Sequence, residues 1–177
     1  GVVSGCATPR PGRGSPKGKL AHACVGVADM MGGTDLQSFK SHAGLEIVAI
    51  CDVDRNHLAK AAALVPGARQ YTDWREMLAA EGDRIDSVNV TVPDHMHAAI
   101  ALRAIRAGKH TYCQKPLAHD VAECRALTRA AKKYGVVTQL GTQHAAGLGD
   151  RMTVQFLRSG IIGKFKRVVL CSNRPGA

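Results

Sequence analysis

The sequence predicts an α/β fold, a doubly wound and mostly parallel sheet followed by the beginning of a second, α+β domain. Two observations predict this fold. Short apolar segments of strand length alternate with amphipathic helical segments over residues 20–144, and that order calls for parallel strands joined by right-handed crossovers. Loops rich in glycine and polar residues follow the strands, at the edge where such sheets bind their ligands.

The first strand–turn–helix–strand unit occupies residues 20–54. Ala21–Val27 is an apolar run of strand length, and it leads into the glycine-rich loop Gly26–Gly33. A helix is expected to open at Thr34, and Leu45–Cys51 reads as a second buried strand that stops at Asp52. This order is typical of a Rossmann dinucleotide-binding domain, in which the turn binds the pyrophosphate and the acid binds ribose hydroxyls.

Further helices are predicted where apolar side chains recur every three or four residues between a cap and a stop. Asp73 caps a helix over Trp74–Ala80, while Asp120 caps another in capping-box register with Glu123. Gly108 and Gly135 are the expected helix stops. The expected buried stripes are Leu58, Ala62 and Val65 in Asn56–Val65, Ala98, Leu102 and Ile105 in His97–Ala107, and Leu127, Ala131 and Tyr134 after Asp120.

Four more short segments complete the predicted sheet: Arg69–Tyr71, Ile85–Val92, His110–Cys113 and Val136–Leu140. The carboxyl ends of parallel strands lie at one edge, so the loops that follow them are expected to converge on one crevice although they are far apart in sequence. These loops are Gly26–Gly33, Asp52–Arg55, Val92–His97, Gln114–Pro116 and Gly141–His144.

Three regions are expected along the chain: a flexible basic leader over residues 1–19, the dinucleotide-binding domain over 20–144, and the incomplete start of a substrate domain over 145–177. In the last region Asp150 is expected to cap a helix over Arg151–Ser159, with Met152 and Phe156 facing inward, before a strand over Phe165–Ser172. One helix and one strand bury too little surface for a core of their own.

Residues 1–19 are rich in Pro, Gly and Ser, and Val3-Ser4-Gly5-Cys6 resembles a bacterial lipobox. Lipidation of Cys6 would place the protein at the bacterial cell envelope, on the periplasmic side, and its absence would leave a cytoplasmic protein. The alternative is a chance match in a disordered leader. No apolar run reaches the ~18 residues of a membrane span, so we expect membrane contact only through Cys6.

The net charge of +10 favours anionic ligands. A nucleic-acid partner is not expected, because the sequence has no basic stripe interleaved with aromatic residues. The six cysteines have no C-x-x-C spacing, and Cys24, Cys51 and Cys113 fall in predicted core strands. His95 and His97 lack the spacing of metal ligands, so no metal site is predicted.

Three loop motifs carry a family resemblance: Asp52 after the second strand, Thr91–His97 after the fourth, and Cys113-Gln114-Lys115-Pro116 after the fifth. With the later Gly160-Ile161-Ile162-Gly163-Lys164 turn, they resemble the Gfo/Idh/MocA family of NAD(P)-dependent oxidoreductases over residues 20–177. The resemblance implies hydride transfer between nicotinamide and a hydroxyl-bearing carbon of a sugar or cyclitol-like substrate. It also implies a full-length homo-oligomer with a small polyol or sugar as partner, while this piece alone is expected to be inactive.

The resemblance implies one catalytic residue, Lys115, whose ammonium would hydrogen-bond the substrate alcohol or the developing alkoxide. Gln114 stands where the family usually has glutamate. Asp52 favours NAD by binding a ribose diol, while Arg55 lies near enough to receive the 2′-phosphate of NADP. The implied cofactor-binding residues are Gly26, Ala28, Met30, Met31, Asp52, Arg55, Val92, Pro93, His97, Gln114, Lys115 and Gln143.

Two departures from the family turn leave a second hypothesis open. The family has glycines where this chain has Ala28 and Asp29, so a methyl group and a negative charge lie near the expected pyrophosphate. The alternative to an enzyme is therefore a non-catalytic module that keeps the dinucleotide-binding fold with weakened cofactor affinity.

Overall fold

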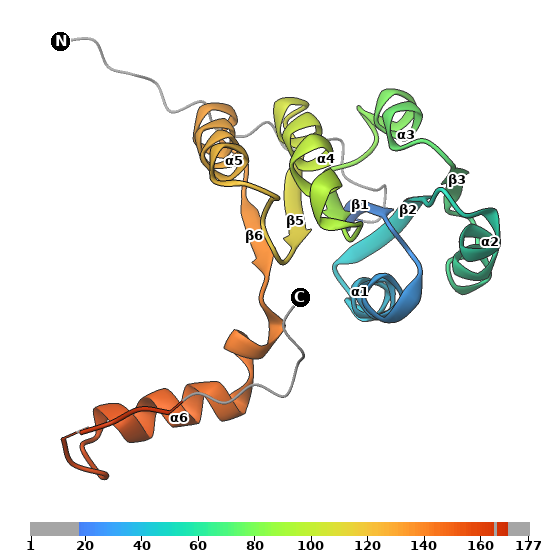
Figure 1. The fold of residues 1–177 in the computed structure, drawn as a ribbon. Coiled ribbons are helices and arrows are strands. Elements are labelled where there is room, and N and C mark those ends of the chain that lie inside the picture. The colour runs from blue at the N-terminus through green and yellow to red at the C-terminus, as the bar shows by residue number, and fades with distance from the viewer. Residues whose placement is uncertain (1–17, 165, 170–177) are drawn as a thin grey trace, which may run out of the picture. The chain divides into compact units, whose positions relative to one another are not determined.

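The structure is a computed structural model that describes residues 18–164 and 166–169 (Figure 1). The chain separates into two compact units, the first ending at Gly141 and the second beginning at Thr142. The first unit contains the sheet and the helices that cover it.

The first unit is built on a six-stranded sheet in the order β3-β2-β1-β4-β5-β6, and every neighbouring pair is parallel. This is the strand order of the doubly wound dinucleotide-binding fold, with its topological switch point between β1 and β4. The predicted fold class is therefore confirmed. The strands are β1 Leu20–Val25, β2 Leu45–Cys51, β3 Arg69–Tyr71, β4 Ser87–Val90, β5 His110–Gln114 and β6 Thr138–Gly141.

Helices cover both faces of the sheet (Figure 1). Leu36 of α1 and Leu58 of α2 pack with Ile50 on one face. Met77 of α3 and Ile100 of α4 belong to the larger cluster on the other face, which α5 also joins. Burying an aliphatic side chain of this size contributes about 1.5–3 kcal/mol. The helices are α1 Asp29–Ser41, α2 Arg55–Leu64, α3 Trp74–Glu81, α4 Asp94–Arg106 and α5 Val121–Tyr134.

The predicted helix caps at Asp73 and Asp120 are present. The Asp73 carboxylate accepts a hydrogen bond from the backbone N–H of Arg75, and that of Asp120 accepts from Glu123. The Glu123 carboxylate accepts from the backbone N–H of His119, one residue before the position that a standard capping box uses. Each such cap typically contributes about 1 kcal/mol to helix stability.

Several predicted boundaries were wrong. Helix α1 begins at Asp29 rather than Thr34, so most of the predicted Gly26–Gly33 loop is the first turn of a helix. Helix α4 begins at Asp94 rather than His97, since Pro93 is its N-cap and fixes φ before an acidic first turn. Strand β6 begins at Thr138, and Tyr134, expected to be buried, is 42% exposed.

The second unit contains a 3-10 turn, η1 Gln143–Ala146, and helix α6 Leu148–Arg158. The N-cap of α6 is Gly147 rather than the predicted Asp150, which lies in the first turn of the helix. Met152 and Phe156 were expected to face inward, but they are exposed. Of the predicted strand Phe165–Ser172, the described residues 166–169 form no strand, and the other positions lie outside the described residues.

The part of the chain that the structure describes has no helix long and apolar enough to cross a membrane. Cys6, on which the lipidation hypothesis depends, lies outside that part.

The turn between β1 and α1 depends on a close backbone approach. Gly26 has φ of +81°, and a Cβ there would lie 1.9 Å from the Thr91 carbonyl oxygen. The N–H of Gly26 donates to the Cys51 carbonyl at 2.9 Å, so the end of β1 is held against the end of β2. A Cβ on Gly32 would lie 2.9 Å from the Gly26 carbonyl oxygen, so α1 packs closely on the turn.

We predict that Gly26→Ala lowers the free energy of unfolding by about 3 kcal/mol or more, because the added methyl meets backbone at a positive φ. Gly33→Ala is the matched control: its Cβ meets nothing within 4 Å, and alanine should stabilise the interior of α1 by about 0.5–1 kcal/mol. Urea unfolding followed by circular dichroism measures both changes. Equal stabilities for the two variants would contradict the close approach at Gly26.

Candidate functional site

The candidate site lies at the carboxyl edge of the sheet, where four loops of the first unit leave their strands. Gln143, another of the predicted cofactor-binding residues, belongs to the second unit. The predicted residues at this edge are Gly26, Ala28, Met30 and Met31 after β1, Asp52 and Arg55 after β2, Val92, Pro93 and His97 after β4, and Gln114 and Lys115 at the end of β5.

The amino end of α1 has no side-chain cap. Ala28 is the N-cap residue with extended backbone, φ −110° and ψ 177°, and its methyl group supplies no acceptor for the first N–H groups of the helix. Such an end attracts anions, because free N–H groups and the helix dipole point at the ligand. Among the predicted residues of this turn, Ala28 and Met31 are half-buried, while the Met30 side chain lies outside the described parts.

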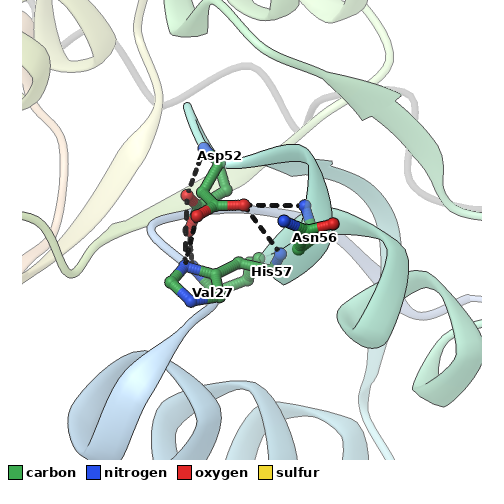
Figure 2. A network of polar contacts seen from close by, with 5 residues as sticks. Val27, Asp52, Asn56 and His57 are labelled. Atoms are coloured by element: carbon green, nitrogen blue, oxygen red, sulfur yellow. Dashed lines mark hydrogen bonds and ion pairs between the residues drawn. The ribbon is translucent and has the colours of Figure 1, made fainter.

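Asp52 ties this turn to the loop after β2 (Figure 2). Its Oδ2 accepts from the backbone N–H of Val27 at 3.0 Å, and its Oδ1 accepts from that of Asp54 at 3.0 Å. The Nδ1 of His57 lies 4.0 Å from Oδ1. An ionised carboxylate has about four acceptor positions, so these contacts leave capacity for the hydroxyls of a ribose. Arg55, the first residue of α2, is exposed beside this group.

The His97 side chain connects the loops after β4 and β5. It is 1% exposed, its Nε2 lies 2.8 Å from the Val92 carbonyl oxygen and its Nδ1 lies 2.5 Å from that of Pro116. Val92 is half-buried and Pro93 exposed, so these two predicted residues leave part of their surface at the edge. The imidazole itself is enclosed, and its contacts fix the two loops relative to each other.

Lys115 directly follows β5 and is exposed. Its backbone N–H donates to Gln114 Oε1 at 3.3 Å. Within the described residues, no hydrogen bond or ion pair engages its ammonium group. The ammonium therefore remains available to a ligand.

A buried carboxylate that the sequence reading did not single out joins three of these elements. Asp35, in the second turn of α1, is 5% exposed. Its Oδ2 accepts from the Thr91 hydroxyl at 2.7 Å, and the Gln114 side-chain amide donates to Oδ2 at 2.8 Å and to Oδ1 at 3.1 Å. Asp35 thus binds the first residue after β4 and the last residue of β5.

Further hydrogen bonds lead from Thr91 through buried polar side chains of β4 and β1. Asn89 Nδ2 donates to Thr91 Oγ1 at 3.0 Å, and the oxygen of the same amide lies 3.2 Å from His22 Nε2. His22 Nδ1 lies 2.7 Å from Ser87 Oγ. Burial lowers the pKa of His22 to about 4, against a weaker opposing effect of the Asn89 hydrogen bond. A neutral ring then donates from Nε2 and accepts at Nδ1, so every donor in the chain points toward Asp35.

Within the described residues, no group of three or more His, Cys, Asp or Glu side chains could hold a metal ion. The thiols of Cys24, Cys51 and Cys113 are free and buried. Burial and the neighbouring carboxylate of Asp52 raise the pKa of Cys51 to about 12, and burial raises that of Cys113 to about 12. These thiols are therefore core side chains rather than nucleophiles.

Residues 20–142 match the family model described as an oxidoreductase family with an NAD-binding Rossmann fold. The chain is 36% identical over 111 residues to an uncharacterized oxidoreductase of Rhizobium meliloti, covering 63% of this chain and 33% of that protein. It is 29% identical over 149 residues to inositol 2-dehydrogenase of Salmonella typhimurium, covering 82% of this chain and 43% of the relative.

A solved structure, myo-inositol 2-dehydrogenase from Lactobacillus plantarum, superposes with a TM-score of 0.76 at 25% identity, covering 82% of this chain and 43% of that one. The chain therefore spans less than half the length of each of these proteins.

We predict that His22 makes the stability of the protein depend on pH between 6.5 and 4. Its pKa is lower in the folded chain than in the unfolded chain, so the unfolded state binds more protons in this window. The stability is complete above pH 6.5 and falls on acidification, by up to about 3 kcal/mol near pH 4. His22→Gln should unfold with a flatter pH dependence, because glutamine does not titrate. Urea midpoints between pH 7 and 4 measure the difference, and parallel curves for the two proteins would contradict the assignment.

Proposed function

The chain belongs to the Gfo/Idh/MocA oxidoreductase family with its NAD-binding Rossmann fold, and we propose that it is the cofactor-binding part of a dehydrogenase. The enzyme would transfer hydride between nicotinamide and a hydroxyl-bearing carbon of a sugar or cyclitol-like substrate. The observation that carries the proposal is the uncapped amino end of α1, which lies at the β1–β4 switch point beside Asp52. The amino end of the helix suits the pyrophosphate of a dinucleotide, and the carboxylate suits its ribose hydroxyls.

The residues present fit such a cofactor, and each has a distinct task. The free N–H groups at the amino end of α1 would bind the pyrophosphate. Asp52 would accept hydrogen bonds from the adenosine ribose, and the Val27 N–H that it binds keeps its carboxylate next to the turn. A bound nicotinamide supplies the carbon that accepts or gives hydride.

Lys115 would act on the substrate hydroxyl. Its exposed ammonium follows the last residue of β5, and the backbone bond to Gln114 holds its main chain in place. A positive charge there stabilises the alkoxide that forms as the alcohol loses its proton. His97, enclosed between the carbonyls of Val92 and Pro116, would fix the loop that carries Lys115.

NAD is the proposed cofactor in preference to NADP. The Asp52 carboxylate suits a ribose diol and repels a 2′-phosphate. Arg55 is exposed next to it and offers the one cation in the Asp52–Arg55 loop for that phosphate, so NADP is the alternative. The competing electrostatic effects of Asp52 and Arg55 would decide between the two cofactors.

The substrate class rests on what relatives act on, since one of them is an inositol 2-dehydrogenase. Residues 145–177 would open the domain that contacts the substrate. The exposed apolar side chains of α6, including Met152 and Phe156, suit a helix that packs against further structure. We accordingly propose that these 177 residues bind cofactor without turnover, and that the full-length protein is a homo-oligomer.

The alternative is a non-catalytic module whose cofactor affinity has been weakened at the turn. The observation that favours it is Ala28 at the N-cap, followed by Asp29 as the first residue of α1. A carboxylate near a pyrophosphate opposes binding by about 1–4 kcal/mol when its charge is uncompensated.

A titration of NAD+ and NADH into the purified chain, followed by calorimetry, separates the two functions. The proposed function predicts saturable binding, and Ala28→Gly/Asp29→Gly should tighten it by about tenfold to several hundredfold as the repulsion and the methyl group are removed. Ala63→Gly, at an exposed position of α2, is the matched control and should leave the affinity unchanged.

Failure of the unsubstituted chain to bind at millimolar cofactor would favour the non-catalytic module. Unchanged affinity in the doubly substituted turn would contradict the role given to Ala28 and Asp29.

A further inference from the structure

Asp35 is a buried negative charge without a positive partner at the edge where the cofactor is proposed to bind. Its carboxylate is 5% exposed, and both groups that donate to it, the Thr91 hydroxyl and the Gln114 amide, are neutral. No ion pair to Asp35 is present among the residues that the structure describes. Burying a carboxylate in this way costs free energy, so the charge calls for an explanation beyond packing.

The groups around the Asp35 carboxylate add no compensating positive charge. Burial and Asp35 both raise the pKa of Tyr112, and the same two causes raise that of Cys24, so both groups stay neutral near pH 7. A chain of hydrogen bonds runs from Ser87 through His22, Asn89 and Thr91, and each donor in it points toward Asp35. Aligned donors of this kind stabilise an anion without neutralising it.

The identity of residue 114 follows from this arrangement. A glutamine donates to Asp35 through Nε2 and accepts from the Lys115 N–H through Oε1. A glutamate would place a second carboxylate about 3 Å from the first, and like charges at that distance do not both ionise. The Gln114 amide fits because residue 141 has no side chain: a Cβ on Gly141 would lie 2.6 Å from Gln114 Oε1. The Asp35–Gln114 pair thus carries one negative charge, on α1 instead of on β5.

We propose that Asp35 selects the oxidised cofactor by attracting the positively charged nicotinamide ring of NAD+. This inference rests on the proposed function, because it takes the nicotinamide to lie beside Lys115 and the ends of β4 and β5. NAD+ and NADH share the adenosine, the pyrophosphate and both riboses. They differ by the hydride added at C4 of the nicotinamide, which removes the positive charge of the ring. A fixed negative charge below that ring therefore strengthens the binding of NAD+ relative to NADH.

The test compares the ratio of the dissociation constants for NADH and NAD+ in four proteins of the full 177-residue chain, measured by calorimetry. Asp35→Asn removes the charge and should lower the ratio by about fivefold to twentyfold, mainly through weaker NAD+ binding. Asp35→Asn/Gln114→Glu moves the charge to the other end of the same hydrogen bond and should restore most of the ratio. Asp120→Asn removes an exposed charge while keeping the cap of α5, and should leave the ratio unchanged.

The ratio separates charge selection from a purely structural role, because local distortion weakens the binding of both cofactors together. Equal weakening in Asp35→Asn, or no recovery in the charge-swapped double variant, would overturn the inference while leaving cofactor binding intact. Absence of binding for either cofactor in the unsubstituted chain would overturn the proposed function along with it.

A second measurement needs no substitution and covers the case in which Asp35→Asn does not fold. In protein labelled with 13C at its aspartate carboxyl groups, saturating NAD+ should move the Asp35 resonance much further than saturating NADH. Equal movement with the two cofactors would overturn the inference.

Discussion

The organisation of the site depends on the hydrogen bonds that converge on Asp35. A single buried carboxylate on α1 accepts from Thr91 after β4 and from Gln114 at the end of β5, so the helix behind the glycine turn is tied to both neighbouring loops. An unmade bond here would leave a buried charge unsatisfied, which costs more than the bond itself contributes. The geometry of the edge is therefore specified by the need to satisfy Asp35.

The close approach at Gly26 makes those bonds reachable. Because Gly26 has no side chain, the Thr91 backbone lies against the turn, and the Thr91 hydroxyl reaches Asp35 of α1. Asp52 binds the same turn from the opposite side through the Val27 N–H. Asp52 thus holds the turn from β2, while Asp35 holds Thr91 and Gln114 against α1. The N–H groups at the amino end of α1 remain for an anionic ligand.

The sequence predicts the fold well because strand and helix periodicities are local signals. The parallel pairing of the strands follows from the alternation of elements, and the caps at Asp73 and Asp120 follow from residue type and spacing. The start of α1 was missed because glycines favour a loop prediction, whereas Gly32 is required by packing on the turn. Asp35 was missed since an acid on an amphipathic helix is usually exposed. The signal that could have found it was Gln114, whose amide needs a buried acceptor at the position of the family's glutamate.

Mapping where NAD+ contacts the chain, through amide resonances in a 1H–15N NMR titration, tests the proposed dinucleotide site most directly. The largest shifts are expected to cluster at the carboxyl edge, in residues 26–33 and at the amides of Asp54, Thr91 and Lys115. The opposite edge, at the amino ends of the strands, should shift little. Shifts that concentrate at the amino ends, or that scatter evenly over the sheet, would contradict a dinucleotide site built around Asp35 and the turn at Gly26.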